Sequence, residues 1–199
     1  MRPISLLLLL MLAGCSSLAP APKTLPASER ELHWQQQQLQ MESLQQWQLA
    51  GKLGIRTESS SASVHLNWDQ GSDHYRIRIA SAIGQTLALL QGSPGGVALS
   101  TADDSTLYSI SAEQLLREEL GWELPVSDLH YWIRGIPAPG SSTPRLNNQG
   151  LLESLQQGRW SLRFNRYQQV GRWQLPGRLI AEGPEARLTF IINDWKPLN

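Results

Sequence analysis

The sequence predicts a mainly β domain in which one long antiparallel sheet curls around a few helices packed on its apolar face. Two observations predict this fold. From Trp47 onward, apolar and polar residues alternate with period two in segment after segment, which is typical of strands with one buried and one wet face. Two short segments of helical character interrupt the strands between residues 111 and 135. No internal repeat divides the chain, so we expect a single domain over residues 28–199.

The amino terminus reads as a secretory signal with a special ending. Arg2 precedes an apolar run at residues 4–12 and then small residues, and this run is too short for the roughly 20 apolar residues of a membrane span. The run ends in Leu-Ala-Gly-Cys at residues 12–15, which resembles the bacterial lipobox, whose cysteine receives a diacylglycerol. We therefore predict a lipoprotein signal peptide at residues 1–14 and lipidation at Cys15. The alternative is an ordinary signal peptide with an incidental cysteine.

A lipidated Cys15 has consequences for location and stability. Two or more acyl chains anchor a protein stably to a bilayer. The next residue is Ser16, not aspartate, which by resemblance to sorted lipoproteins implies the outer membrane, with the body in the periplasm. The proline-rich residues 15–27 predict a lipidated, flexible linker. Since Cys15 is the only cysteine, no intramolecular disulfide is expected and the core must stabilise the domain.

The charge balance indicates no obvious polyanionic partner. Loss of Arg2 with the signal takes the 17 Lys and Arg residues to 16, against 17 Asp and Glu, so the net charge is about −1. Basic residues are scattered through the predicted strands rather than clustered in sequence. We therefore expect no nucleic-acid partner and no strong attraction to anionic lipid.

The elements follow in order from local signals. A surface helix is expected over residues 28–46, with Ser28 and Glu31 as a capping box. Strands are then expected at residues 47–55, 64–68, 75–79, 87–91, 97–100 and 106–110. Ser111 and Gly121 predict the two ends of a helix over residues 112–120. Ser127 can cap a short helix that runs to Trp132, and a Pro/Gly/Ser-rich loop is expected at 136–144. Four strands close the chain, at residues 160–164, 171–175, 178–182 and 187–193.

The apolar side of this sheet is rich in tryptophan. The chain has eight tryptophans and two phenylalanines. An ordinary core is one interpretation, because large aromatics dominate core packing. As a set beneath loosely packed helices, they favour an apolar cavity suited to an acyl chain. Candidate cavity residues are Trp47, Leu49, Leu53, Leu66, Trp68, Ile77, Ile79, Leu87, Leu89, Trp132, Trp160 and Leu162.

One predicted hairpin tip is unusually apolar. Residues 80–84 read Ala-Ser-Ala-Ile-Gly, whereas tips usually carry Gly, Asn, Asp and Pro. Either Ile83 folds back onto the core, or it dips into a membrane or a partner. Insertion of an exposed isoleucine would gain roughly 1.5–3 kcal/mol.

Catalytic patterns are weak. The four histidines show no metal-ligand spacing, and no Gly-x-Ser-x-Gly elbow occurs. The glycine-rich residues 92–96 lack the lysine of a phosphate-binding loop. We therefore expect a protein that is not an enzyme and uses no metal or cofactor.

Taken together, several short motifs resemble the LolB family of outer-membrane lipoprotein receptors. The motifs span nearly the whole mature chain, at residues 47–53, 66–68, 83–84, 124–125, 131–132, 135–137, 158–160, 175–176 and 188–192. The resemblance implies an incomplete, open antiparallel β-barrel with helices as a lid over an apolar cavity. It also implies a receptor that accepts lipoprotein acyl chains from a soluble periplasmic carrier of the LolA type and inserts them into the inner leaflet of the outer membrane.

The resemblance also assigns a role to the tip. The family has a leucine after a proline there, where this chain has Ile83 after Ala82. The implied membrane-contacting loop is therefore Ile83 and Gly84, with the contact made by Ile83. We expect the receptor to act as a monomer. The alternative function is a structural or assembly-scaffold periplasmic lipoprotein, whose Ile83 meets another protein.

Overall fold

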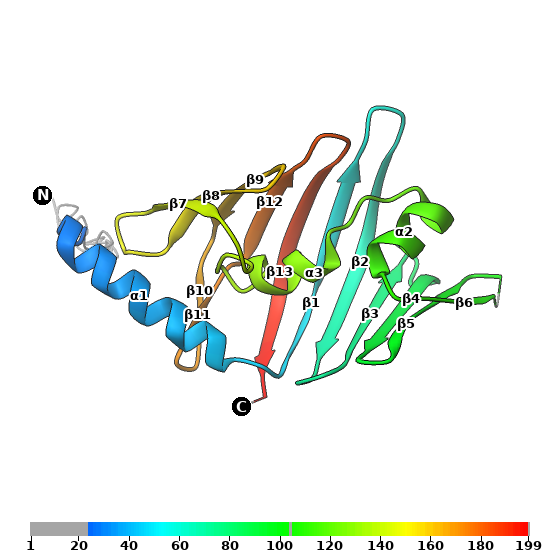
Figure 1. The fold of residues 1–199 in the computed structure, drawn as a ribbon, viewed down its shortest axis with the longest axis horizontal. Helices are drawn as coiled ribbons and strands as arrows, with labels where there is room; N and C mark the ends of the chain where they lie inside the picture. Colours follow the sequence, from blue (N-terminus) through cyan, green and yellow to red (C-terminus); the bar gives the residue numbers. More distant parts are fainter. Residues whose placement is uncertain (1–23, 104, 199) are drawn as a thin grey trace, which may run out of the picture.

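The computed structural model describes residues 24–103 and 105–198, so the predicted signal peptide and Cys15 lie outside the described residues. One antiparallel sheet of eleven strands dominates, in the order β6-β5-β4-β3-β2-β1-β13-β12-β9-β8-β7 (Figure 1). Its edges, β6 and β7, are not hydrogen-bonded to each other, so the sheet is open. The prediction of a mainly β, open antiparallel fold is confirmed.

The strands and helices have the following bounds. The first half holds α1 (Ala27–Ser43), β1 (Trp47–Arg56), β2 (Ser61–Gln70), β3 (Tyr75–Ala80), β4 (Thr86–Ser93), β5 (Gly96–Thr101) and β6 (Thr106–Ser109). The second holds α2 (Ala112–Leu120), α3 (Val126–Trp132), β7 (Ser142–Leu146), β8 (Leu152–Gln157), β9 (Trp160–Asn165), β12 (Arg178–Glu182) and β13 (Arg187–Pro197). A separate hairpin consists of β10 (Gln168–Val170) and β11 (Trp173–Leu175).

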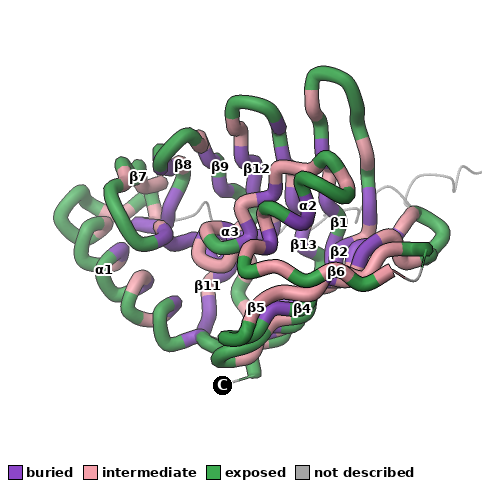
Figure 2. Tube along the Cα trace, turned by 45° about the vertical axis from the view of Figure 1, so that its right-hand side comes forward, coloured by how far each residue is buried: buried purple, intermediate pink, exposed green. Residues whose placement is uncertain are grey.

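Strand register gathers the apolar side chains on one face. Leu49, Trp68, Ile77, Leu90 and Leu99 form one row across β1 to β5, and all five are buried. Their chain neighbours point to the opposite face, because side chains alternate along a strand. The buried segments of the tube accordingly line the inside of the curled sheet (Figure 2).

The lid segment, residues 111–138, crosses this apolar face and carries α2 and α3 (Figure 1). The α2 prediction is confirmed: the Gln114 N–H donates to Ser111 Oγ at 3.2 Å, and Gly121 ends the helix with a left-handed φ of 65°. Helix α3 lies where it was predicted, but the prediction that Ser127 caps it is wrong. Pro125 precedes the helix, and Ser127 instead donates to a side chain of α2.

The first helix differs from its prediction at both ends. It begins at Ala27 after Pro26, has no side-chain cap, and ends at Ser43 rather than near residue 46. Pro26 supplies a backbone φ that suits the start of a helix and occupies the N-cap position, so Ser28 falls two residues too late to cap it. Helix α1 contacts β11, where the Gln37 amide donates to Gln174 O at 2.8 Å.

The largest error of the sequence analysis concerns β7 and β8. The loop predicted at 136–144 ends in β7, which pairs with the unpredicted β8. Pro144 made a strand look implausible there. Because β7 is an edge strand, however, no further neighbour requires a hydrogen bond from Pro144. Within the described part of the chain, no helix is long and apolar enough to cross a membrane.

Candidate apolar ligand site

An apolar pocket lies between the sheet and the lid segment. The sheet supplies side chains from β1 to β4 and β13, and the lid supplies side chains from α2, α3 and the turn between them. The lining residues are Leu53, Leu66, Trp68, Ile77, Ile79, Leu90, Leu116, Leu124, Val126, Leu129 and Phe190. Its only polar side-chain group, the Trp68 indole N–H, is satisfied by Gln70 Oε1 at 3.1 Å.

This pocket is filled by the protein itself. It leaves a volume of ≈20 Å³, little more than one water needs, whereas small-molecule sites measure roughly 300–1,000 Å³. Leu116 and Leu129, from α2 and α3, occupy space over the sheet where an apolar ligand would lie. In this structure the pocket is therefore closed and has no room for a ligand the size of an acyl chain.

The structure brings together five of the twelve predicted cavity residues. Leu53, Leu66, Trp68, Ile77 and Ile79 line the pocket. The other lining residues were not predicted from the sequence. Those from the lid were hard to find because a helix side chain and the strand beneath it share no periodic signal.

The remaining predicted residues lie elsewhere on the apolar side. Trp47 is fully buried in an aromatic cluster, 5.2 Å from the Trp68 ring centroid and 5.3 Å from that of Trp195. Leu49 follows on the same face of β1. Farther along the sheet, Trp132, Trp160 and Leu162 belong to the same core on the β8 and β9 side.

Leu87 and Leu89 need a correction. In β4, Ala88 and Leu90 face the pocket side, whereas Leu89 pairs with Arg78 and Ser100 on the other face. Leu87 is half-buried at the edge of the core. Side chains alternate between the two faces of a strand, so leucines at 87, 89 and 90 cannot all face the pocket. The prediction chose Leu87 and Leu89, which are two residues apart, whereas Leu90 is the leucine that faces the pocket.

A second hollow of ≈230 Å³ opens beside the apolar pocket and shares Trp68 and Val126 with it. Its other lining residues are Gln70, Tyr75, Ser127, His130 and Tyr131. Burial, with the nearby Arg134 charge, lowers the pKa of His130 to about 4, and burial raises the pKa of Tyr75 to about 12. At neutral pH this opening is therefore uncharged but polar, which suits the polar end of a lipid whose chain lies in the pocket.

Glu113 holds the two lid helices together. Its Oε1 accepts from the N–H and the hydroxyl of Ser127 at 2.9 and 2.8 Å, and its Oε2 accepts from Ser111 Oγ at 3.0 Å. Burial alone would raise the pKa of Glu113, but these hydrogen bonds outweigh it and lower the pKa. The ionised carboxylate thus ties α2 to the start of α3.

Two buried polar side chains hold the other end of the lid. The Arg134 guanidinium donates to the carbonyls of Met41, Leu44 and His130 at 2.8, 2.9 and 3.0 Å. The Gln157 amide on β8 donates to Ala138 O at 2.7 Å and accepts from the Trp132 indole at 2.8 Å. Arg134 is only 3% exposed and its pKa falls to about 10, mainly through burial, so it remains charged at neutral pH.

The apolar tip is exposed. Ile83 is 89% accessible to solvent, so the structure rules out the alternative in which it folds back onto the core. Gly84 has a φ of +85°, which the turn requires and which few other residues adopt. The Arg78 guanidinium supports the turn by donating to Gly84 O at 2.8 Å and Thr86 Oγ1 at 2.9 Å.

Metal-ligating groups do not gather in the described residues, where no set of three or more His, Cys, Asp or Glu side chains could hold an ion. The site is therefore an apolar pocket with a polar opening, a lid and an exposed apolar tip. An open antiparallel half-barrel built in this way defines a class of proteins that shelter apolar ligands.

Solved structures share this fold. A LolA superfamily protein from Nitrosomonas europaea superposes with a TM-score of 0.54, covering 82% of this chain and 94% of that one at 10% identity. A DUF1329 family protein from Desulfovibrio piger gives a TM-score of 0.55, with 85% and 93% coverage at 9% identity. At such low identity these likenesses concern the fold alone.

The sequence comparisons identify the family. The family model described as "Outer membrane lipoprotein LolB" matches residues 45–195. Outer-membrane lipoprotein LolB of Pseudomonas putida KT2440 is 38% identical over 195 residues, which cover 98% of this chain and 95% of that protein. The protein of that name from Cellvibrio japonicus Ueda107 is 38% identical over 203 residues, with 98% and 97% coverage. The chain belongs to the LolB family.

Proposed function

We propose that this protein is a lipid-anchored receptor of the outer membrane that accepts the acyl chains of lipoproteins from a soluble periplasmic carrier and inserts them into the membrane. The observation that carries this proposal is the apolar pocket filled by its own lid. Family membership and the open half-barrel support it. The anchor would be Cys15, and the LolA-type carrier, the monomeric state and the absence of catalysis are parts of the same proposal.

The filled pocket meets the energetic requirement of a transfer step. Bare acyl chains cannot cross water, because each exposed methylene costs about 0.8 kcal/mol. A receptor must hold the chains, yet release them to the bilayer. When the lid opens to admit an acyl chain, Leu116 and Leu129 lose contacts with the sheet, and this cost weakens net binding. Transfer onward to the bilayer can then run downhill without a nucleotide.

Acyl binding is tested with a fluorescent fatty acid and the full mature chain. We expect saturable binding, and we expect Leu90→Gln to weaken it about tenfold or more through lost apolar contact. Leu89→Gln is the matched control, because Leu89 lies on the opposite face of the same strand. Absence of saturable binding, or equal effects of the two changes, would reject the acyl site and favour a scaffold lipoprotein.

The role of Ile83 is tested separately in delivery. Ile83→Glu should leave acceptance from the carrier intact and slow insertion into vesicles by about 10- to 100-fold, because the tip loses the gain of a buried isoleucine. Ile110→Glu is a control of equal chemistry, since Ile110 is 94% exposed at a different site. Unchanged delivery by Ile83→Glu would remove the tip from the mechanism.

A further inference from the structure

The charged residues are segregated on the folded chain, although they are scattered in sequence. Register gathers cations from five strands, β3, β1, β13, β12 and β9, on the face opposite the apolar pocket, whereas β2, between β3 and β1, contributes none. We call this surface the outer basic face. Its members are Arg76, Arg78, Lys52, Arg56, Lys196, Arg187, Arg178 and Arg163.

Few carboxylates offset these cations. On these five strands and on β2, the same face carries only Asp69, Asp194 and Glu182 among the residues described. Glu182 takes two cations, Arg163 and Arg187, each at 3.2 Å. In the part of the chain that the structure covers, no ion pair involves any other member of the outer basic face.

The lid carries the opposite charge. Between residues 111 and 132, five carboxylates accompany a single cation, Arg117. They are Glu113, Glu118, Glu119, Glu123 and Asp128. The formal net charge of zero over the whole sequence therefore hides a molecule with one positive and one negative side. The expectation of no attraction to anionic lipid, which rested on net charge, does not hold for a surface of this kind.

The outer basic face is continuous with the apolar tip. Arg78 is one of its members, and the same guanidinium donates to Gly84 O next to Ile83. A surface that meets the membrane through Ile83 therefore presents cations immediately behind the inserted residue. Hydrophobic insertion backed by basic side chains is a recurrent way to hold a protein against anionic lipid headgroups.

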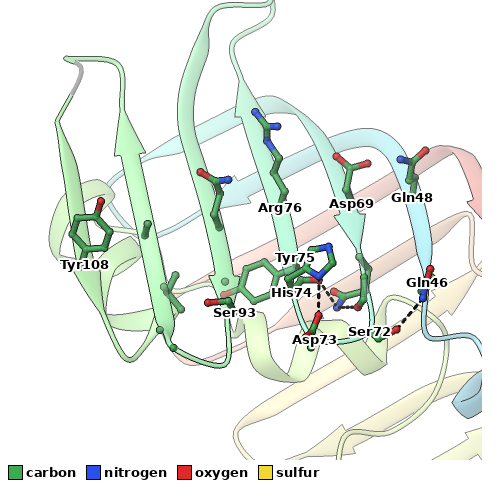
Figure 3. A pocket seen from close by; sticks show the side chains of 18 of the residues that line it. Gln46, Gln48, Asp69, Ser72, Asp73, His74, Tyr75, Arg76, Ser93 and Tyr108 are labelled. Atoms are coloured by element: carbon green, nitrogen blue, oxygen red, sulfur yellow. Dashed lines mark hydrogen bonds and ion pairs between the residues drawn. The ribbon is translucent and has the colours of Figure 1, made fainter.

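One end of this surface is also hollowed. Figure 3 shows Gln48, Asp69 and Arg76 on adjacent strands, pointing to the same side. They border a basin of ≈1,050 Å³ that reaches to the hairpin at Ser72 and to Tyr108 on β6. Because Asp69 and Asp73 lie in the basin with Arg76, the basin adds no net positive charge, and the other cations of the outer basic face lie beyond it.

We propose that the outer basic face lies against anionic phospholipid headgroups and so orients the receptor with its lid toward the periplasm. The inference rests on the proposed function in taking the membrane as the one that Ile83 enters. The lid carboxylates support the same orientation, because an anionic surface repels them. A tether at Cys15, nine residues before Thr24, does not by itself select which face meets the bilayer.

The test uses the mature, lipidated chain reconstituted into vesicles. With Cys15 acylated, Asn67→Cys on the outer face and Glu119→Cys on α2 each supply one free thiol for a fluorophore. The vesicles contain phosphatidylethanolamine with either phosphatidylglycerol or phosphatidylcholine, and a lipid with a headgroup spin label acts as quencher. We expect strong quenching at Asn67 and little at Glu119, only with phosphatidylglycerol and only at low salt.

Charge variants provide the matched comparison. Each Lys or Arg near an anionic surface shifts the equilibrium about fivefold, so Lys52→Gln with Arg76→Gln should shift the orientation by about 25-fold and abolish the difference between the labels. Arg117→Gln with Arg159→Gln removes the same amount of charge outside the outer basic face. This pair should leave the difference in quenching between the two labels intact. Equal quenching at both labels, or quenching that ignores phosphatidylglycerol, would overturn the inference. Lipoprotein transfer measured in the same vesicles separates this failure from failure of the proposed function.

Discussion

The two ends of the lid are held by different kinds of interaction. At the end near residues 132–138, buried polar groups fix the chain: Arg134 bonds three carbonyls, and Gln157 bonds both Trp132 and Ala138. At the other end, α2 lies against β5 and β6 with Leu115 and Leu116 in the core, accepts one long bond from Ser109 at Gln114 Oε1, and is tied to α3 by the partly exposed Glu113. We call these the fixed end and the free end of the lid.

This difference indicates how the pocket opens. Breaking the fixed end would leave buried hydrogen-bond donors and acceptors unpaired, at a cost of about 1–3 kcal/mol for each group. Helix α2, in contrast, can move away from the sheet by exchanging its apolar contacts there for contacts with a ligand. The lid should therefore swing from residues 132–138, with α2 moving most. If the comparison is right, variants at the fixed end lower global stability, and variants at the free end mainly change how readily ligand is admitted.

The largest effect is expected at Arg134. Arg134→Met removes the charged donor that the carbonyls of Met41, Leu44 and His130 share, and Met41 O keeps only the bond from the Leu44 N–H at 3.2 Å. We expect the free energy of unfolding to fall by about 3–5 kcal/mol, because three buried hydrogen bonds from a charged donor are lost. Urea unfolding followed by tryptophan fluorescence measures it. Arg117→Met on α2 is exposed and should stay within about 0.5 kcal/mol; a loss at Arg134 no larger than this would disprove a fixed end.

A smaller loss is expected at Gln157. Gln157→Leu leaves the Trp132 indole and the backbone N–H and carbonyl of Ala138 without their partner, and should cost about 2–4 kcal/mol. The neighbouring Gln156→Leu is exposed on β8 and serves as the control. Faster amide hydrogen exchange confined to residues 132–138 should accompany the loss. If amide hydrogen exchange instead becomes faster throughout α2, residues 132–138 are not the fixed end of the lid.

Much of this architecture could be predicted from the sequence, because its signals are local. Alternation of apolar and polar residues with period two predicts the strands from β1 to β5 and their buried face. The capping residues Ser111 and Gly121 predict the two ends of α2. The exposed tip at Ile83 was one of two open alternatives, since apolar composition alone cannot say whether a hairpin tip meets core or solvent.

The contacts that decide the lid could not be predicted, because they join residues far apart in sequence. Arg134 meets the end of α1 about ninety residues earlier, and Gln157 lies on β8, a strand whose glutamines and leucines show no clear alternation. The outer basic face was missed for a similar reason. Its cations are one or two residues in each of five strands, and only the register places them together.

The smallest effect, and the one most specific to the free end, is expected at Glu113. Glu113→Gln removes the charge that accepts from Ser127 and should cost about 1 kcal/mol, because the carboxylate is only partly buried. Since folding lowers the pKa of Glu113 below its usual 4.5, this contribution is present above pH 4.5 and is lost as the pH falls through the lowered value. The stability gap between the native chain and Glu113→Gln should therefore close on acidification. Protonation of His130 affects both proteins and cancels. A fluorescent fatty acid should bind faster to Glu113→Gln at neutral pH, while Glu119→Gln behaves as the native chain; if both variants bind at the native rate, the free end does not control admission to the pocket.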